Sequence, residues 1–167
     1  MIFVSVGTHP QQFDRLIAMI DALKRDDVIR EEVFIQRGCS LYRPTACKFE
    51  DLLAYDVMVE YVRKCSIYIS HGGPGNIFLG LQNDKIPIVV PRMKEYGEHV
   101  DNHQVDLVKR LEFEKRILAV YSDMTNIKDK ILNYERLIST LHKPIAENVG
   151  LQRLVENLIS YTNQIAK

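Results

Sequence analysis

Apolar residues recur along the chain in two alternating patterns. Short apolar runs predict buried strands, at 2–6, 32–36, 66–70, 86–90 and 116–120, with another short strand near 48–49. Apolar residues at helical spacing between these runs predict helices, at 13–23, 56–64, 76–83, 102–111, 126–138 and 148–165. The alternation predicts an α/β fold, a parallel sheet with helices on both faces.

Length and composition narrow the class of protein. The 167 residues are expected to form a single domain, 1–167, and 22 Lys and Arg balance 22 Asp and Glu, so nothing globally basic points to nucleic acid. No apolar run approaches the ~20 residues that span a bilayer, and the first residues read as a strand, not a signal peptide. Cys39, Cys47 and Cys65 lack metal or disulfide spacing, which favours free thiols in a reducing cytoplasm.

The candidate chemistry lies between residues 70 and 104. Ser70-His71-Gly72-Gly73-Pro74-Gly75-Asn76 connects a predicted strand to a predicted helix. Its glycines allow a ligand to approach the backbone closely, and the N–H groups at the start of a helix favour an anion such as phosphate. Gly97-Glu98-His99-Val100-Asp101-Asn102-His103-Gln104 follows the next strand, which Pro91 closes. A phosphate loop followed by polar side chains suits a nucleotide joined to a sugar.

Several other kinds of site are disfavoured. The chain has no GxxxxGK[ST] phosphate loop, no GxSxG elbow and no HExxH helix. A dinucleotide motif beginning at Gly73 would place Phe78 at its third glycine. His99 and His103 are four residues apart with Asp101 between them, but this spacing alone is a weak metal signal. We therefore expect no metal site.

The combined motifs resemble the C-terminal domain of glycosyltransferase family 28. The similarity rests on the loop at 70–75, the Ile86-Pro87-x-x-Val90-Pro91 strand, the segment from Gly97 to Gln104, and the start Val4-Ser5-Val6-Gly7-Thr8 with Phe13-Asp14-Arg15-Leu16. It covers roughly residues 1–115. The chain most resembles the catalytic subunit of two-piece bacterial capsule and exopolysaccharide glycosyltransferases. The eukaryotic two-subunit enzyme that makes dolichol-linked chitobiose is a more distant relative.

The resemblance implies a Rossmann-like half of the GT-B architecture that binds a UDP-sugar as donor substrate, with no further cofactor. Around the diphosphate it implies Gly7, Thr8, His71, Gly72, Gly73, Gly75 and Asn76. Around ribose and donor sugar it implies Glu98, Asn102, His103 and Gln104. Arg92 either neutralises a phosphate or is a solvated charge at a strand end. Gly80 occupies the position nearest to the ribose-binding glutamate of single-chain relatives, so that contact is absent or moved.

Structural explanations compete with several of these assignments. The glycines can simply form a tight turn, His71 can cap a helix or bond a backbone carbonyl, and Asn102 is a good N-cap for the helix that follows. His103 and Gln104 can serve only to satisfy the first turn of that helix.

The expected reaction is inverting, metal-independent transfer from the UDP-sugar to a lipid-linked glycan in capsule or exopolysaccharide repeat-unit synthesis. His9 and Glu98 are the candidate bases in this chain, and a partner residue is the alternative. A GT-B enzyme has two Rossmann-like domains, so a membrane-associated partner subunit would supply the acceptor half and hold this cytoplasmic chain at the inner membrane face. A homo-oligomer is also compatible with the sequence. A non-catalytic nucleotide-sugar-binding regulatory subunit and an epimerase-like half are the alternative functions.

The predicted helix at 148–165 is the expected docking element for that partner. It carries an apolar stripe, which consists of Leu151, Leu154, Val155, Leu158 and Ile159. The alternative is that this stripe packs on the chain's own sheet.

Overall fold

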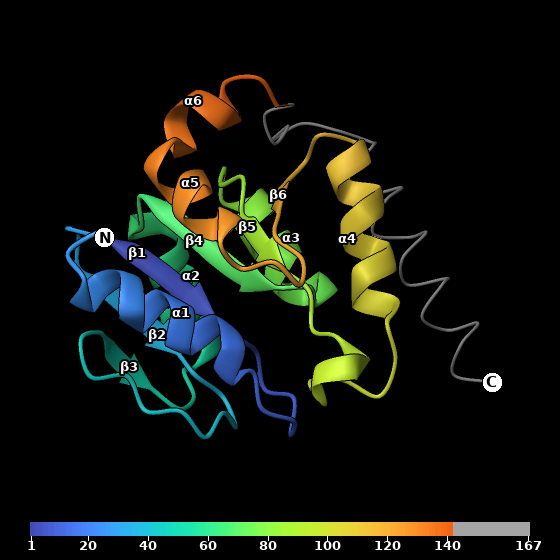
Figure 1. The fold of residues 1–167 in the computed structure, drawn as a ribbon. Helices are drawn as coiled ribbons and strands as arrows, with labels where there is room; N and C mark the ends of the chain where they lie inside the picture. Colours follow the sequence, from blue (N-terminus) through green and yellow to red (C-terminus); the bar gives the residue numbers. More distant parts are fainter. Residues whose placement is uncertain (142–167) are drawn as a thin grey trace.

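A single parallel sheet organises the computed structural model, which describes residues 1–141 (Figure 1). Its six strands lie in the order β3-β2-β1-β4-β5-β6. They are β1 (Ile2–Ser5), β2 (Val33–Gln36), β3 (Lys48–Glu50), β4 (Ile67–His71), β5 (Ile88–Val90) and β6 (Leu118–Ala119). Every neighbouring pair is parallel. The predicted α/β fold is therefore confirmed, and the expected helix at 148–165 lies outside the described residues.

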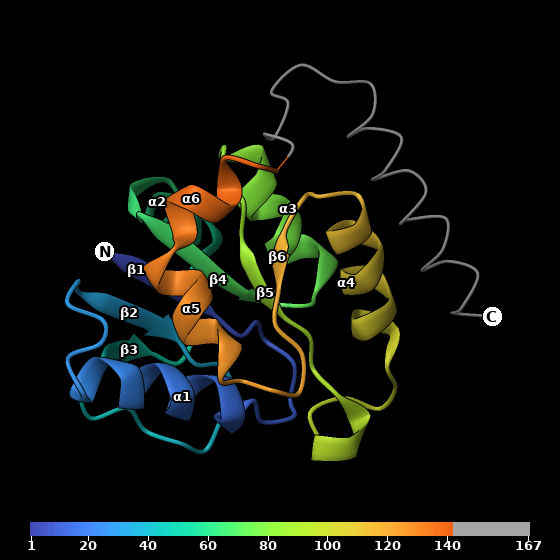
Figure 2. The ribbon, with the colours of Figure 1, turned by 45° about the horizontal axis from the view of Figure 1, so that its top comes forward.

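Helices cover both faces of this sheet (Figures 1 and 2). They are α1 (Asp14–Arg25), α2 (Tyr55–Lys64), α3 (Pro74–Gln82), α4 (His103–Phe113), α5 (Asn126–Leu132) and α6 (Tyr134–Ile138). Successive side chains of β1 point to opposite faces of the sheet, so the core has a part on each face. Ile2 and Val4 pack with α1, α5 and α6 on one face, and Phe3 packs with α2 and α3 on the other. A further cluster joins α3 and α4 to β5 and β6. The helical face predicted at 13–23 is buried throughout.

Some element boundaries differ from the sequence prediction. The helix expected over 126–138 is interrupted at Asn133, which ends α5 and precedes α6. The interruption brings Tyr134 into the core, where its hydroxyl donates a 2.6 Å hydrogen bond to the carbonyl of Ile86. The sequence analysis did not predict the short 3-10 helix η1 (Lys94–Tyr96). Helix α3 begins at Pro74, two residues earlier than expected.

The strand order creates a crevice at the carboxyl edge of the sheet. From the adjacent strands β1 and β4 the chain continues to β2 on one side and to β5 on the other. The loops that follow two such strands diverge, and ligands of open α/β sheets bind between them. The loop after Ser5 and the loop after His71 meet at this point, because Ser5 pairs with Ser70. Within residues 1–141, no helix has both the length and the apolar character needed to cross a membrane.

Candidate functional site

A cavity of about 610 Å³ opens at this crevice. Eight of the residues predicted from the sequence line it, namely Gly7, Thr8, His9, His71, Gly73, Gly75, Asn76 and Gln104. Six further lining residues were not predicted as site residues, namely Gln36, Leu53, Tyr55, Met58, Pro74 and Leu79. Five predicted residues lie elsewhere, namely Gly72, Arg92, Glu98, Asn102 and His103. The cavity therefore combines the polar loops that follow β1 and β4 with apolar side chains of α2 and α3.

The first turn of α3 faces this cavity without a side-chain cap. Gly73 is the N-cap, Pro74 is the first helical residue, and no side chain bonds the free N–H groups that follow. Proline at this position loses nothing, because its missing N–H would have had no partner in the helix. A Cβ built on Gly75 would meet no atom within 4 Å. An anion can thus reach the exposed amides at the positive end of the helix.

His71 lies between the two glycine loops. A Cβ on Gly73 would lie 2.2 Å from its Nε2, and a Cβ on Gly7, whose φ is +78°, would lie 2.6 Å from its Cε1. These glycines therefore make room for the imidazole as well as for a ligand. Burial, together with the positive charge of Arg92, lowers the pKa of His71 to about 3. The ring is neutral at physiological pH.

Gln36 is the most important polar residue that sequence reasoning missed. Its Oε1 accepts hydrogen bonds from the Gly7 amide (3.0 Å) and the Ser5 hydroxyl (2.9 Å). Its Nε2 donates to the carbonyls of Gly7 and Asp51, both at 3.0 Å. The side chain thereby fixes the loop after β1. The sequence did contain one sign of this role, because Gln36 is a polar residue at the end of a strand whose other residues are apolar.

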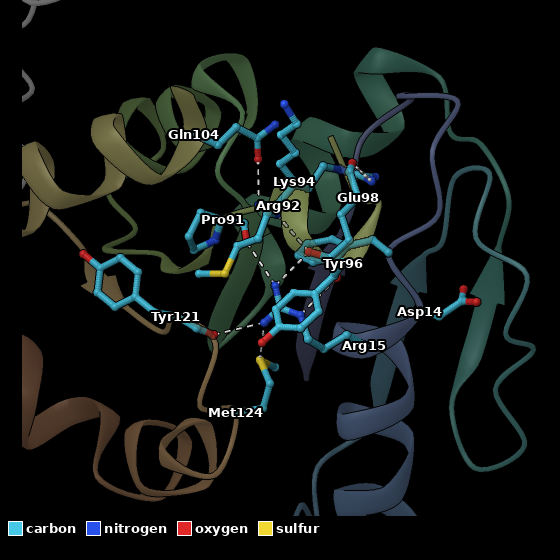
Figure 3. Close-up of polar contacts among 12 residues, drawn as sticks. Asp14, Arg15, Pro91, Arg92, Lys94, Tyr96, Glu98, Gln104, Tyr121 and Met124 are labelled. Atoms are coloured by element: carbon cyan, nitrogen blue, oxygen red, sulfur yellow. Dashed lines mark hydrogen bonds and ion pairs between the residues drawn. The ribbon is translucent and has the colours of Figure 1, made fainter. Parts of the chain in front are cut away.

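Arg92 does not line the cavity, and its side chain is fully buried. Figure 3 shows its polar surroundings. Its guanidinium donates to four backbone carbonyls, those of Val6, Gln11, Gln12 and Glu98. Burial lowers the pKa of Arg92 to about 10, so the side chain keeps its positive charge at neutral pH. From the sequence we expected Arg92 either to neutralise a phosphate or to be a solvated charge at a strand end. Both expectations are corrected, because the side chain is fully buried and bonds backbone carbonyls of the protein. Arg92 binds the loop that follows β1, and its charge acts on the cavity from a distance.

Glu98 is also buried, and its carboxylate is occupied by protein groups (Figure 3). Arg15 donates to both of its oxygens, from Nε at 3.0 Å and from Nη2 at 2.9 Å. The Met93 amide donates to Oε2 at 3.0 Å. A carboxylate held in this way is not placed to take a proton from an acceptor or to contact ribose. The expectation that Glu98 is a base or a ribose ligand is therefore replaced by a structural role.

The polar residues at the start of α4 have separate functions. Gln104 lines the cavity, and its Oε1 accepts the backbone N–H of Arg92 at 3.1 Å. Asn102 is the N-cap residue, yet its side chain accepts the Lys94 amide rather than a helix N–H. Asp101 accepts the His103 amide at 3.0 Å and contacts the imidazoles of His99 and His103. Of the three predicted sugar contacts in this segment, the structure brings only Gln104 to the cavity.

Gly72 and Gly80 allow neighbouring parts of the protein to pack closely against the backbone. A Cβ on Gly72 would lie 2.9 Å from Cβ of Gln104, so this glycine allows the loop after β4 to approach α4. A Cβ on Gly80 would lie 2.8 Å from the Tyr68 ring, because α3 packs closely on the sheet there. A glutamate at position 80 would not fit this packing. The ribose contact of single-chain relatives is therefore not made from this position.

His9 is the lining residue best suited to proton transfer. Burial lowers its pKa, and the neighbouring His99 and Arg92 lower it further, so the ring is neutral at pH 7. The centroids of the His9 and His99 rings are 4.7 Å apart. Nδ1 of His9 accepts the Gln11 amide at a long 3.3 Å. Proton uptake at Nε2 therefore requires the ring proton to move to Nδ1, which breaks that weak bond.

The two histidines of the cavity, His9 and His71, are neutral at pH 7 because their pKa values are lowered. Among residues 1–141, no lysine, arginine, aspartate or glutamate lines it. The same residues contain no group of three or more His, Cys, Asp or Glu side chains arranged to hold a metal ion. In this chain, an anionic ligand would be held by backbone amides, a helix dipole and neutral side-chain donors.

Comparisons with known proteins agree with this geometry. The model of the glycosyltransferase family 28 C-terminal domain matches residues 1–157. The chain is 33% identical over 109 residues to a protein of Yarrowia lipolytica named UDP-N-acetylglucosamine transferase subunit ALG13, an alignment that covers 64% of this chain and 52% of that protein. It is 32% identical over 122 residues to the Homo sapiens protein of the same name, covering 68% of this chain and 10% of that one.

The fold also matches a solved glycosyltransferase structure. The glycotransferase of kitacinnamycin aligns with a TM-score of 0.54 and 13% identity, covering 82% of this chain and 35% of that one. This likeness supports the fold alone. The chain spans about half the length of the first curated relative and a tenth of the second. The motifs had led us to expect relatives among bacterial capsule and exopolysaccharide enzymes, but both of these relatives are named UDP-N-acetylglucosamine transferase subunit ALG13. With its family model matched from residue 1 to 157, the chain belongs to glycosyltransferase family 28, as a C-terminal domain of that family.

Proposed function

We propose that this chain is the donor-binding and catalytic subunit of a UDP-sugar-dependent, inverting glycosyltransferase. The uncapped first turn of α3, facing a cavity at the switch point between β1 and β4, is the observation that carries the proposal. It supports a diphosphate site between Gly7-Thr8 and residues 73–76. UDP is proposed as the nucleotide because both curated relatives are named UDP-N-acetylglucosamine transferase subunits. N-acetylglucosamine is accordingly the first donor sugar to test.

The cavity supports nucleotide binding by its shape and chemistry. Leu53, Tyr55, Met58 and Leu79 supply apolar lining beside the polar loops, and Tyr55 is 72% exposed. A nucleobase needs an apolar or aromatic surface, whereas a diphosphate needs donors. We assign His9 as the general base of this chain, acting on the acceptor hydroxyl with its ring proton on Nδ1. The α3 amides stabilise the charge that develops on the UDP leaving group.

The acceptor and its membrane partner are the further parts of the proposal. A lipid-linked glycan, a place in capsule or exopolysaccharide synthesis, and a cytoplasmic location at the inner membrane face are proposed from the sequence motifs alone, and the names of the two relatives do not refer to them. A partner subunit is supported by the word "subunit" in the names of both relatives. That partner would bring the acceptor to the cavity.

The test combines binding with transfer. The full 167-residue chain is titrated with UDP, UDP-N-acetylglucosamine and other UDP-sugars by calorimetry, with ADP as the control for the base. Transfer to a lipid-linked glycan is then measured with and without candidate partner subunits, and the anomeric configuration of the product is determined. UDP binding and partner-dependent transfer are expected. Equal affinity for ADP, or retained anomeric configuration, would contradict the proposal.

A second function is favoured by one observation. Glu98 is held by Arg15 and Nδ1 of His9 accepts a backbone amide, so neither of the two candidate bases within residues 1–141 has a free basic side-chain atom placed at the cavity in this state. A donor-binding subunit whose partner provides the base fits this arrangement. Transfer that survives replacement of His9 by alanine with unchanged kcat would establish this second function.

A further inference from the structure

His9 lies on a part of the chain that regular secondary structure does not support. It belongs to the loop after β1, between the exposed residues Thr8 and Pro10, and lies in neither a helix nor a strand. Its Nδ1 accepts the Gln11 amide at a long 3.3 Å. A weak hydrogen bond does not by itself keep the ring of a loop residue in one orientation. A further contact is needed to hold this ring at the cavity.

The imidazole of His99 supplies that contact from the loop after β5. The centroids of the two rings are 4.7 Å apart, and their planes differ by 30°. Aromatic rings attract one another in such offset arrangements, at centroid distances of about 4.5–7 Å. His9 lines the cavity whereas His99 does not. His99 therefore contacts a residue of the cavity without lining the cavity itself.

Asp101 holds the His99 ring from its other side. Its Oδ1 is 3.0 Å from Nδ1 of His99 and also accepts the backbone N–H of His103, the first residue of α4, at 3.0 Å. Its Oδ2 is 2.7 Å from Nδ1 of His103. Burial raises the pKa of Asp101, but the hydrogen bonds from His103 outweigh burial and lower it, so the carboxylate is charged at neutral pH. Nδ1 of His99 is also 3.3 Å from the Asp101 amide, and the closer, charged oxygen assigns the ring proton to Nδ1.

The backbone that carries His99 is also fixed. The preceding residue, Glu98, is buried in its ion pair with Arg15, and its carbonyl accepts a hydrogen bond from Arg92 at 3.2 Å. Both the side chain and the backbone next to His99 are therefore held by groups of the core. A continuous set of contacts runs from the start of α4 through Asp101 and His99 to His9.

We propose that His99 and Asp101 are positioning residues: Asp101 holds the His99 imidazole, and the His99 ring keeps that of His9 in one orientation at the cavity. The inference rests on the proposed function for the role of His9 as the base. Neither positioning residue lines the cavity. Movement of the His9 proton between Nε2 and Nδ1 leaves the plane of the ring unchanged, so the stack supports both tautomers. Fixed orientation of a catalytic group raises kcat and does not require tighter donor binding.

The charges around His9 act separately from this packing. Burial lowers the pKa of His9 first, the charges of His99 and Arg92 lower it further, and Asp101 raises it. His71 also lies close enough for the charge of His9 to lower its pKa. Positioning is therefore tested at about pH 8.5, about two units above the ordinary pKa of histidine, where His9 is neutral in every variant.

The first experiment measures the freedom of the His9 ring without any ligand. The full chain is labelled with 13C-histidine, and 13C relaxation at Cδ2 gives an order parameter for each ring. The His9→Gln variant identifies the His9 signal by its disappearance. The ring of His9 is expected to be restricted in the unmodified chain and mobile in His99→Ala. An equal order parameter in the two chains would overturn the inference, whatever the chain binds.

The second experiment separates the ring of His99 from its charge by transfer kinetics with the partner and acceptor present. At pH 8.5, His99→Ala should lower kcat by about tenfold or more with an unchanged KM for the UDP-sugar, because the base loses its fixed orientation. His99→Phe keeps a flat ring against His9 but loses the bond to Asp101, so its loss of kcat should be smaller. The acidic limb should move to higher pH in both variants, since both lack the His99 charge. A loss in His99→Phe as large as that in His99→Ala would overturn the role of the ring.

The part played by Asp101 is tested in two backgrounds. Asp101→Ala should lower kcat in the unmodified chain but not in His99→Phe, where no Nδ1–H remains for it to hold. Asp106→Ala is the matched control, because Asp106 is an exposed aspartate in the first turn of α4. An equal loss from Asp101→Ala in both backgrounds would show that Asp101 does not act through His99.

The outcomes separate this inference from the proposed function. If His9→Ala transfers with unchanged kcat, the assignment of the base fails, and positioning of a base by His99 fails with it. The relaxation measurement still decides whether His99 holds the His9 ring. If His9→Ala loses transfer but His99→Ala keeps the kcat of the unmodified chain at pH 8.5, the base assignment stands and the inference is overturned.

Discussion

Arg15 and Glu98 form a two-bond ion pair, with an Nε–Oε1 distance of 3.0 Å and an Nη2–Oε2 distance of 2.9 Å. The same guanidinium donates to the carbonyls of Pro91 and Tyr121, so one side chain joins α1 to three loops (Figure 3). Only 1% of the Glu98 side chain and 17% of the Arg15 side chain are exposed. Among the residues that the structure describes, this pair and Arg92 hold the carboxyl edge of the sheet around the cavity.

Removing the charge of Glu98 should therefore destabilise the fold. Glu98→Gln leaves the Arg15 charge buried without its partner, which typically costs about 3 kcal/mol or more. Urea denaturation of the variant should show this loss. Lys64→Met is the control, because its ion pair with Glu60 is exposed and should contribute less than about 1 kcal/mol. Normal stability combined with lost transfer would return Glu98 to a direct role in the reaction.

Gly75 and Gly73 should respond differently to added side chains. A side chain at Gly75 extends into open space at the cavity, so Gly75→Val should weaken UDP binding tenfold or more with little change in unfolding free energy. Gly73→Ala places a methyl group against the His71 ring and should lower stability by about 1–3 kcal/mol through overpacking. Calorimetric titration and urea denaturation measure the two effects. Unchanged UDP affinity in Gly75→Val would exclude a ligand at the start of α3.

His9 should determine the acidic limb of the pH profile of transfer. A base must be neutral, so kcat should fall as pH drops below the pKa of His9, which lies beneath its ordinary value. His9→Ala should reduce kcat by about 10²-fold or more while UDP still binds. His99→Ala removes a neighbour that lowers the pKa of His9, so the acidic limb should move to higher pH.

The control for that shift is His103→Ala. His103 is not among the groups that affect the pKa of His9, so the acidic limb should stay where it is in the unmodified enzyme. An acidic limb that stays unchanged in His99→Ala, or is present unaltered in His9→Ala, would assign the base to another residue.

Asp21 should make stability depend on pH. This buried carboxylate of α1 accepts bonds from the amides of Thr45, Ala46 and Cys47 and from the hydroxyls of Tyr42 and Thr45. Burial alone would raise its pKa, but the bonds from Thr45, Ala46 and Tyr42 outweigh burial and lower it. With a folded pKa below the unfolded one, its stabilisation is complete above about pH 4 and is lost as pH falls through the folded pKa.

Asp21→Asn tests this dependence. The variant should lose roughly 2 kcal/mol or more at pH 7, because an amide cannot accept all of these bonds. The gap between the variant and the unmodified chain should narrow at pH 3, because protonation of this aspartate in the unfolded chain removes part of the stabilisation there. Urea denaturation at both pH values measures the gap. A gap that is equal at the two pH values would mean that the charge of Asp21 is not what holds residues 42–47.

Local pattern was enough to predict the fold and the two loops that line the cavity. The apolar face at 13–23 and the alternation of strands and helices are properties of the chain itself, because burial requires a period that matches each element. Glycines between a buried strand and a helix indicate a ligand loop for the same local reason. The residues from Gly7 to His9 and from His71 to Asn76 accordingly reach the cavity, apart from Gly72.

Only the tertiary structure decided which polar side chains face the cavity and which are buried. Glu98 meets Arg15 from 83 residues away, and Gln36 reaches Gly7 from 29 residues away. A charged residue after a strand reads the same in sequence whether it faces a ligand or a distant partner. Its role is fixed by the groups that the fold brings within hydrogen-bond reach, because a buried polar atom must be paired. The break at Asn133 follows the same logic, since Tyr134 reaches Ile86 across the core.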